Sequence, residues 1–245
     1  MQLRAMLRSL GVVALVATVV GSVPITSAES ATGGVVAAAV DILGPGVGAD
    51  ATQAAVRIRP PFPCGEQRVF IVGDSLTVGA DYFGKLGSLL TGAGYLPRIN
   101  AIEGRFTSAG ATILRDEALA GRLERVVMVA LGTNDAAAGY STTSFAGNVD
   151  KVMTAVGASR IVLWVNLQMK STTTRPYLDA ATVNFNAVLT TKSSQYPNLR
   201  IADWSATPNR IYLSSDGIHY SSTGYRNRAT FSREQLDSLT CRLTG

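Results

Sequence analysis

The 245 residues of the chain suffice for one domain of ordinary size, or for one domain with a tail. The formal net charge is +5 at pH 7, and it falls to +3 without Arg4 and Arg8, which belong to the N-terminal signal described next. The remaining charge is small and the basic residues are scattered along the chain, which does not favour a nucleic-acid-binding surface, and no nucleic-acid partner is expected.

An export signal is predicted over residues 1–28. Arg4 and Arg8 precede an apolar run, Leu10–Val20, and Thr26-Ser27-Ala28 supplies small residues suited to cleavage. The run is shorter than the ~20 residues that span a bilayer, which favours a cleavable signal over a retained anchor. A lipoprotein anchor is disfavoured because no cysteine directly follows the run. We therefore predict a protein that is secreted or held in the cell envelope, with no stable membrane span after cleavage.

Residues 29–63 are predicted to form a linker or an N-terminal arm, followed by a single folded domain over residues 64–245. The arm is rich in Ala, Gly and Val. It contains Gly44-Pro45-Gly46-Val47-Gly48 and ends in Pro60-Pro61-Phe62-Pro63, and both stretches argue against regular structure.

The two cysteines, Cys64 and Cys241, stand at the two ends of the predicted domain. In an exported chain such a pair usually forms a disulfide. Closing so long a loop would stabilise the fold by roughly 4–5 kcal/mol in the chain-entropy model. The alternative is two unpaired thiols. Since the chain has only these two distant cysteines and one histidine, a zinc site would have almost no Cys or His ligands to use, and we expect no metal and no cofactor.

From residue 68 onward, short apolar runs alternate with longer segments of helical spacing. Strands are expected at residues 68–72, 98–102, 125–131, 160–167 and 199–203. Helices are expected at residues 76–90, 111–123, 144–156, 176–196 and 223–239. This alternation predicts an α/β fold built from βαβ units, with a five-stranded parallel sheet covered by helices on both faces.

Candidate polar residues follow four of the five predicted strands. Ser75 follows the first strand, Gly104 the second, Asn134 the third, and Asp216 with His219 the fifth. Open parallel sheets bind ligands at the carboxyl ends of their strands. The positions of these residues therefore indicate one site at that edge of the sheet.

His219 is the only histidine and hence the obvious proton acceptor near neutral pH. Asp216, three residues earlier with a glycine between them, can turn back to orient the imidazole ring. Ser75 supplies a hydroxyl that needs such a base in order to act as a nucleophile. Taken singly, Ser75 also suits a helix N-cap, and His219 suits an ordinary surface or core position. Together the three residues predict a Ser–His–Asp arrangement.

Three groups are candidates to stabilise a negative oxygen during the reaction. Ser75 lies at a predicted strand-to-helix turn, where backbone N–H groups and the helix dipole favour negative charge. Asn134 can donate its amide N–H, although an Asn/Asp turn is its alternative role. Gly104 can lend a backbone N–H, with Gly110 as a nearby alternative. Among the aromatic residues, Tyr140 and Tyr220 are predicted to lie near the site and bind substrate.

These segments resemble the motifs of the SGNH hydrolases, the GDSL-like esterase and lipase superfamily. The resemblance spans about residues 67–240, in the order of the family. The four matching blocks are Gly73-Asp74-Ser75-Leu76, Gly104, Gly132-Thr133-Asn134-Asp135 and Asp216-Gly217-Ile218-His219. The resemblance implies a flavodoxin-like three-layer α/β/α sandwich and a serine hydrolase that works without metal.

Carried over to this chain, the resemblance implies that Ser75 is the nucleophile, His219 the base and Asp216 its orienting group. It further implies an oxyanion hole formed by the N–H groups of Ser75 and Gly104 and the side-chain amide of Asn134. The sequence departs from the nucleophile elbow of α/β-hydrolases, because Ser75 is not followed by the required glycine.

The leading hypothesis is an exported serine esterase that releases acetyl or other short acyl groups from an envelope carbohydrate or glycolipid. Export alone motivates the choice of substrate class. One alternative is an acyltransferase that passes the same acyl-enzyme to an alcohol. Another is a non-catalytic glycan-binding module on this fold, since fold does not determine function. The presence of Ser75, Asn134 and His219 argues against the module.

Overall fold

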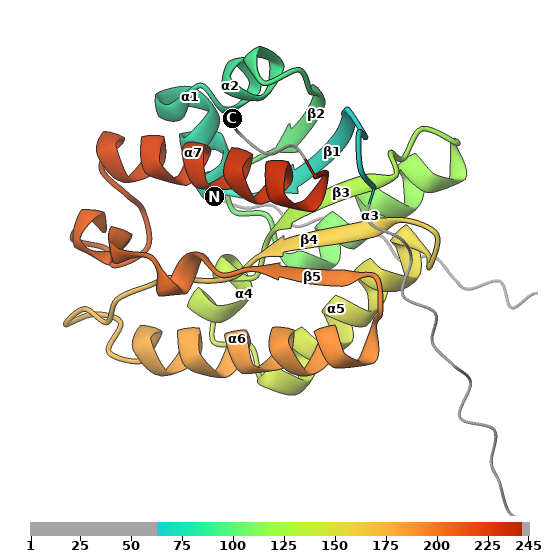
Figure 1. Cartoon of the computed structure of the whole chain (residues 1–245). Coiled ribbons are helices and arrows are strands. Elements are labelled where there is room, and N and C mark those ends of the chain that lie inside the picture. Colours follow the sequence, from blue (N-terminus) through green and yellow to red (C-terminus); the bar gives the residue numbers. More distant parts are fainter. Residues whose placement is uncertain (1–62, 242–245) are drawn as a thin grey trace, which may run out of the picture. The chain divides into compact units, whose positions relative to one another are not determined.

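The computed structural model describes residues 63–241, so the predicted signal peptide 1–28 and nearly all of the predicted arm 29–63 lie outside the described residues. The described part contains a parallel sheet with the strand order β2-β1-β3-β4-β5 (Figure 1). Its strands are β1 (Arg68–Gly73), β2 (Leu96–Ala101), β3 (Val126–Ala130), β4 (Ile161–Val165) and β5 (Leu199–Ala202).

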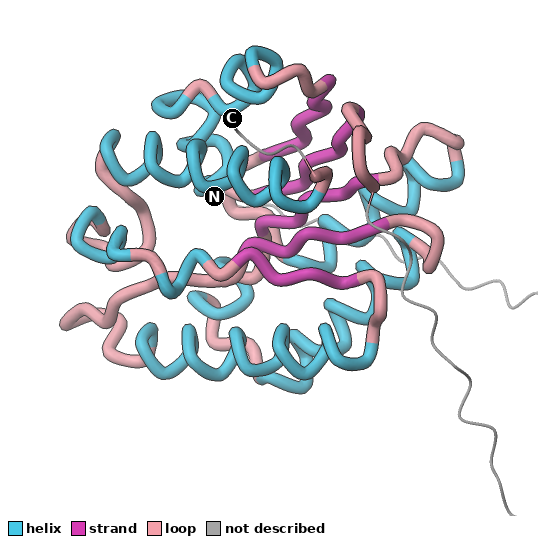
Figure 2. The backbone as a smooth tube through the Cα atoms, viewed as in Figure 1, coloured by secondary structure: helices cyan, strands magenta, loops and turns pink. Residues whose placement is uncertain are grey.

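Helices connect successive strands and cover the sheet. The α-helices are α1 (Ser75–Gly84), α2 (Leu86–Gly92), α3 (Thr107–Leu119), α4 (Thr133–Ala137), α5 (Thr142–Val156), α6 (Leu178–Gln195) and α7 (Ser222–Leu239). Two short 3₁₀ helices, η1 (Trp204–Ala206) and η2 (Pro208–Tyr212), follow β5. Helices α1, α2 and α7 pack together on one face of the sheet, and α3, α4, α5 and α6 lie on the other (Figures 1 and 2).

The strand order confirms the predicted three-layer α/β sandwich with five parallel strands. β1 lies between β2 and β3, so the chain reverses direction across the sheet after β2. This reversal opens a crevice beyond the carboxyl ends of β1 and its neighbours, the place where open α/β sheets bind their ligands. The polar segments singled out from the sequence follow β1, β2, β3 and β5, at this edge.

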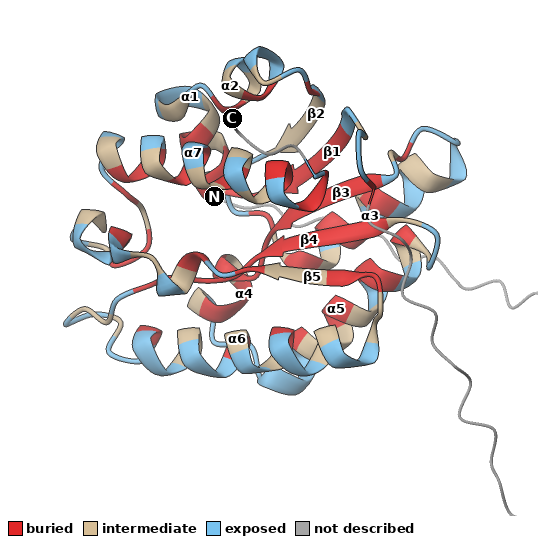
Figure 3. Cartoon of the chain, viewed as in Figure 1, coloured by how far each residue is buried: buried red, intermediate tan, exposed pale blue. Residues whose placement is uncertain are grey.

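The core is continuous across the sheet, because the central strands are covered on both faces (Figure 3). All five residues of β3 and all five of β4 are buried. Apolar runs of this kind, rich in Val, Ile and Leu, are typical of parallel strands that lie between two helical layers.

The helix expected at residues 76–90 is divided into α1 and α2 at Lys85, which has a left-handed backbone (φ 52°). Helix α7 approaches closely at this point: a Cβ placed on Gly84 would lie 2.5 Å from the Cβ of Ala229. The carboxylate of Asp81 then accepts the N–H of Gly87 at 2.8 Å and stabilises the start of α2.

Other boundaries also differ from those expected. β2 begins two residues early and includes Pro97, which is tolerated because β2 is an edge strand that pairs only with β1. Helix α3 begins at Thr107 rather than at residue 111, and the five-residue helix α4 was not predicted. Short helices of this kind carry little periodic signal in a sequence.

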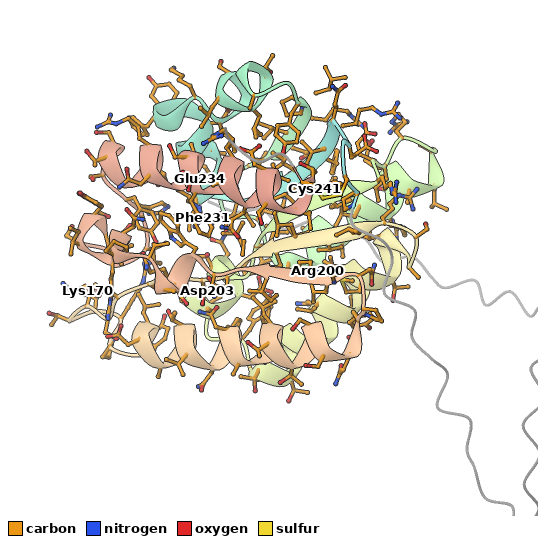
Figure 4. All side chains as sticks on the ribbon, viewed as in Figure 1. Lys170, Arg200, Asp203, Phe231, Glu234 and Cys241 are labelled. Carbon is orange, nitrogen blue, oxygen red and sulfur yellow. A yellow bond between two sulfur atoms is a disulfide. The ribbon has the colours of Figure 1, made fainter. Side chains whose placement is uncertain are left out.

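The predicted disulfide is confirmed. Cys64 and Cys241 are bonded, with their Cα atoms 4.9 Å apart and a sequence separation of 177 (Figure 4 labels Cys241, just beyond the end of α7). The N–H of Gly65 donates to the carbonyl of Thr240 at 3.0 Å beside the bridge. Within residues 63–241, no helix is long and apolar enough to cross a bilayer.

Candidate active site

The turn between β1 and α1 places Ser75 at the head of a helix. Asp74 is the N-cap, and its side chain accepts the N–H of Leu76 at 3.0 Å, so Ser75 is the first helical residue rather than the cap. Only glycine fits before this turn, because a Cβ on Gly73 would lie 2.0 Å from the hydroxyl of Thr77. The hydroxyl of Ser75 therefore sits at the positive end of α1, among backbone N–H groups that have no partner within the helix.

The loop before α7 brings His219 and Asp216 to this serine. The Oγ of Ser75 lies 3.0 Å from Nε2 of His219, and Nδ1 of the same ring lies 2.6 Å from Oδ2 of Asp216. With the proton on Nδ1, the imidazole donates to the carboxylate and its Nε2 accepts from the hydroxyl. The three side chains thus form one hydrogen-bonded chain, although 144 positions separate the serine from the histidine.

Asp216 is held in its ionised form. Partial burial raises its pKa, but hydrogen bonds from the His219 ring, the Ile218 N–H, the Ser214 hydroxyl and the His219 N–H outweigh burial and hold the pKa well below its ordinary value. The hydroxyl of Ser214 donates at 2.7 Å and the N–H of Ile218 at 2.9 Å. A carboxylate fixed in this way can orient the imidazole ring and stabilise its protonated form.

The loop itself is held by a glycine that no other residue can replace. Gly217 has a φ of +75°, and a Cβ placed on it would lie 2.0 Å from the carbonyl oxygen of Lys170, a residue labelled in Figure 4. The N–H of Lys170 donates to the carbonyl of Gly217 at 2.9 Å. The segment after β4 therefore supports the loop that carries Asp216 and His219.

Asn134 is fixed by two acceptors beside the serine. Its Nδ2 lies 3.1 Å from the carbonyl oxygen of Arg105 and 3.3 Å from Oδ2 of Asp74. Arg105 is itself buried, and its guanidinium donates to the carbonyl of Gly73 at 3.1 Å and to the side chain of Asn100 at 2.7 Å. These bonds tie the ends of β1, β2 and β3 together around the amide of Asn134.

Asp74 is a fully buried carboxyl group. Burial raises its pKa to about 6, against the opposing field of the buried Arg228 and the N–H of Leu76. Arg228 is buried as well, and burial lowers its pKa. The sequence analysis did not single out Asp74, Arg105 or Arg228 as positioning groups, because their burial depends on contacts between segments far apart in the chain.

A cavity of about 640 Å³ opens beside the serine. Ser75, Asn134, His219 and Gly104 all line it, so the structure brings these predicted residues together, with Asp216 directly behind His219. Gly104 has a φ of +72° and open space where a Cβ would lie. The alternative, Gly110, packs under Leu131 inside α3 and does not line the cavity.

The expectation for the aromatic residues is wrong at Tyr220. Its side chain is buried, donates to the carbonyl of Gln168 at 3.0 Å, and accepts from Trp204 at 2.8 Å. Tyr140 stacks on Phe106 and is not among the residues that line the cavity.

Three aromatic residues that the sequence analysis missed contribute to the cavity wall: Tyr82, Phe83 and Tyr225. A signal for two of them was present in the sequence. Tyr82 and Phe83 follow Ser75 by seven and eight residues, which places them on the same face of a helix. Across residues 63–241, no three His, Cys, Asp or Glu side chains cluster closely enough to hold a metal ion.

Serine hydrolases use a hydroxyl, an imidazole and a carboxylate in a hydrogen-bonded series. This protein has the same three groups at the carboxyl edge of its parallel sheet. Residues 71–226 match the GDSL-like Lipase/Acylhydrolase family, and the chain belongs to this family. The protein is accordingly a carboxylic ester hydrolase, as the resemblance of its motifs implied. No curated protein matches the sequence.

Solved structures share the fold at low sequence identity. The lipase/acylhydrolase from Enterococcus faecalis is 19% identical with a TM-score of 0.60, over 70% of this chain and 96% of that one. The catalytic domain of peptidoglycan O-acetyltransferase A from Streptococcus pneumoniae is 18% identical with a TM-score of 0.59, over 72% and 96%. A carbohydrate acetylesterase family member from Sinorhizobium meliloti is 13% identical with a TM-score of 0.56, over 72% and 100%.

Proposed function

We propose that the protein is an exported serine esterase that removes acetyl or other short acyl groups from a carbohydrate or glycolipid of the cell envelope. The observation that carries the proposal is the hydrogen-bonded chain of Ser75, His219 and Asp216 at the wall of the cavity. In this proposal Ser75 is the nucleophile, His219 the general base and Asp216 the group that orients the ring.

Acylation begins when Ser75 Oγ attacks the carbonyl carbon of the ester and its proton passes to Nε2 of His219. The carbonyl oxygen becomes an oxyanion, which accepts hydrogen bonds from the N–H groups of Ser75 and Gly104 and from Nδ2 of Asn134. The bond to the alcohol then breaks, and the leaving oxygen takes the proton from Nε2. The product of this half-reaction is an acyl-serine and a free hydroxyl group on the carbohydrate.

Deacylation repeats the same steps with water. His219 takes a proton from a water molecule whose oxygen attacks the acyl carbonyl carbon, and the same three donors hold the second oxyanion. When the intermediate collapses, the bond to Ser75 breaks and His219 returns the proton to Oγ. The carboxylic acid leaves, and the enzyme is restored.

Two observations support export and the substrate class. The segment 1–28 has the composition of a signal peptide, and the Cys64–Cys241 disulfide is the kind of bond that persists outside the cytosol. A carbohydrate ester is supported by the two fold neighbours whose names state peptidoglycan O-acetyl transfer and carbohydrate acetylester cleavage.

The test is hydrolysis of p-nitrophenyl esters from acetate to octanoate by the oxidised mature protein and by its Ser75→Ala variant. We expect turnover that is highest for acetate and falls at least about a thousandfold in the variant, as in other hydrolases that lose a catalytic serine. Preference for the octanoate would contradict the short-chain assignment. Acyl transfer to an added glycan in place of release to water would instead identify an acyltransferase, and glycan binding without any turnover would identify a binding module.

A further inference from the structure

One face of α1 forms a continuous wall of the cavity, starting at the serine. Ser75, Val78, Gly79, Tyr82 and Phe83 all line the cavity, and they recur at the spacing of a single helical face. Seven helical residues correspond to a rise of about 10 Å, so Tyr82 lies well beyond the reach of an acetyl group bonded to Ser75. The outer part of this wall therefore faces a part of the substrate other than a short acyl chain.

The outer wall presents aromatic rings to solvent. The side chain of Tyr82 is 68% exposed and that of Phe83 is 45% exposed, which are large fractions for rings on a well-packed helix. Apolar surface left in water beside a binding cavity indicates a surface that a ligand covers. The two rings touch edge to face, with their centroids 4.9 Å apart.

The packing beneath holds these rings in place. Tyr225 of α7 is buried and stacks on Phe83, with the ring centroids 5.6 Å apart and the planes within 12° of parallel. Tyr225 in turn lies directly on Gly79, where a Cβ would approach its ring to 2.3 Å. Phe83 therefore has a rigid backing, and its other face is available without loss of side-chain freedom on binding.

Polar groups lie beside the two exposed rings in the same cavity. Glu103, on the loop between β2 and α3, is exposed and lines the same cavity, and Tyr82 carries a hydroxyl. A carboxylate accepts hydrogen bonds from hydroxyl groups, and the ammonium group of Lys85, which lies over the Tyr82 ring at 5.4 Å from its centroid, can donate to them. An open aromatic surface also leaves an alkyl chain half in water, whereas a sugar ring covers the aromatic face with its C–H groups and keeps its hydroxyl edge hydrated.

We propose that Tyr82 and Phe83 form a subsite that stacks a sugar ring of the substrate, on the alcohol side of the ester that Ser75 cleaves. This inference rests on the proposed esterase function and specifies its substrate as a glycan ester. The part of the glycan that binds is the saccharide next to the acylated unit, and Glu103 accepts its hydroxyl groups.

The kinetic test compares chemically acetylated cellotetraose with ethyl acetate, an ester that has no ring. In Tyr82→Ala and in Phe83→Ala, the ratio of kcat/KM for the oligosaccharide to that for ethyl acetate should fall about tenfold, the effect of losing one aromatic contact. The ratio should be kept in Tyr82→Phe, which retains the ring. It should also be kept in the control Leu119→Ala, whose side chain is 81% exposed and lines a separate hollow between α3 and α5.

An unchanged ratio in both alanine variants would overturn the subsite. Ethyl octanoate is assayed alongside these two esters, and a loss confined to it would overturn the subsite too, because the rings would then hold an acyl chain.

A binding measurement separates this inference from the esterase proposal. Unmodified cellotetraose is titrated into Ser75→Ala and into Ser75→Ala combined with Tyr82→Ala, with calorimetry as the readout. We expect binding in the first protein and a Kd about tenfold weaker in the second. Absence of binding in the first protein overturns the subsite. If the parent protein hydrolyses no ester, the esterase proposal fails, and this titration still decides whether the rings bind a glycan.

Discussion

Asn134 is the residue whose geometry most directly connects the fold to the proposed chemistry. Its amide nitrogen is held by Arg105 and Asp74, and it lines the cavity beside Ser75. Because a side-chain amide has two N–H donors, the longer of these bonds, at 3.3 Å to Asp74, has to yield when Nδ2 donates to the oxyanion, while the bond to Arg105 keeps the amide in place.

Replacing Asn134 with alanine should therefore lower kcat by about 10²–10³-fold with little change in KM. Steady-state kinetics with p-nitrophenyl acetate measure this effect, and circular dichroism verifies the fold. The control is Asn184→Ala, an exposed asparagine on α6 that does not line the cavity. A loss of less than about tenfold in kcat would exclude Asn134 as an oxyanion donor.

Asp74 makes a second prediction at the residue scale, on stability rather than rate. Its folded pKa of about 6 lies above the ordinary value of 3.8, so the folded state favours the protonated carboxyl. The stabilisation that comes from protonating Asp74 in the folded state is fully present below about pH 4. It is lost as the pH rises to about 6, and above that pH the free energy of unfolding no longer changes through this group. The pKa values of Asp216, Glu117 and Asp203 are lowered instead, so their contributions change only at lower pH.

The variant Asp74→Asn keeps an acceptor for the N–H of Leu76 but cannot titrate. Relative to this variant, the wild type should lose about 3 kcal/mol of unfolding free energy between pH 4 and pH 7, the equivalent of the shift in pKa. Urea unfolding at both pH values measures the difference. The control is Asp116→Asn, at an exposed carboxyl, whose free energy of unfolding should differ from that of the wild type by the same amount at both pH values. If Asp74→Asn also differs from the wild type by the same amount at both pH values, the raised pKa of Asp74 is refuted.

At the scale of elements, the segment between β5 and α7 positions two of the three proposed catalytic groups while containing little regular structure. Its conformation depends on Gly217, whose positive φ and close contact with Lys170 leave no room for a side chain. The same segment carries the N-cap of α7, Ser221, whose side chain accepts from Gly224. The loop that carries Asp216 and His219 therefore continues directly into the capped start of α7.

Gly217→Ala should abolish most activity, because relief of the 2.0 Å contact must move Asp216 and His219 away from Ser75. The matched control is Gly121→Ala: Gly121 also has a positive φ (+67°) but has open space where the Cβ would lie. In both variants an alanine must adopt a left-handed backbone, which destabilises the folded state by about 1–2 kcal/mol. Only Gly217→Ala should lose more unfolding free energy than this strain accounts for, as measured by thermal unfolding, and only this variant should lose ester hydrolysis. Equal behaviour of the two variants would contradict a role for the contact between Gly217 and Lys170 in holding the loop.

At the scale of the whole molecule, the Cys64–Cys241 bond joins the segment before β1 to the end of α7. It closes a loop of 177 residues that contains every strand and helix described. It lies before the amino end of β1, whereas the cavity lies beyond the carboxyl ends of the strands. Its contribution should therefore be to stability rather than to the geometry of the site.

The double variant Cys64→Ser, Cys241→Ser should unfold with a free energy about 5 kcal/mol lower than that of the oxidised protein, the chain-entropy value for a loop of this length. Denaturant unfolding with and without dithiothreitol measures it, and the reductant should have no effect on the double variant. Ester hydrolysis by the variant below its melting temperature should match that of the oxidised protein. A loss of activity in a folded variant would show that the bridge shapes the site.

Much of this organisation is visible in short stretches of the sequence. The apolar runs at β1, β3 and β4 alternate with helical periodicity, and this alternation was enough to predict the parallel sheet and to place Ser75 and Asn134 at its carboxyl edge. The boundary at Lys85 and the helix α4 escaped prediction, because a lysine gives no local signal of a left-handed backbone and α4 is only five residues long. Tyr220 was misplaced because its burial depends on Trp204 and Gln168, which approach it only in the folded chain.

The amino-acid sequence by itself determined three things: the succession of strands and helices along the chain, the family, and the set of candidate catalytic residues. These depend on local periodicity and on short motifs. The tertiary structure alone decided that Ser75 meets His219 at 3.0 Å, that Asp74 is buried, and that Tyr225 contributes to the cavity wall. Each of these outcomes requires segments far apart in the chain to pack against one another, chiefly α1 against α7. No local pattern specifies such contacts, since they depend on the shape of both partners.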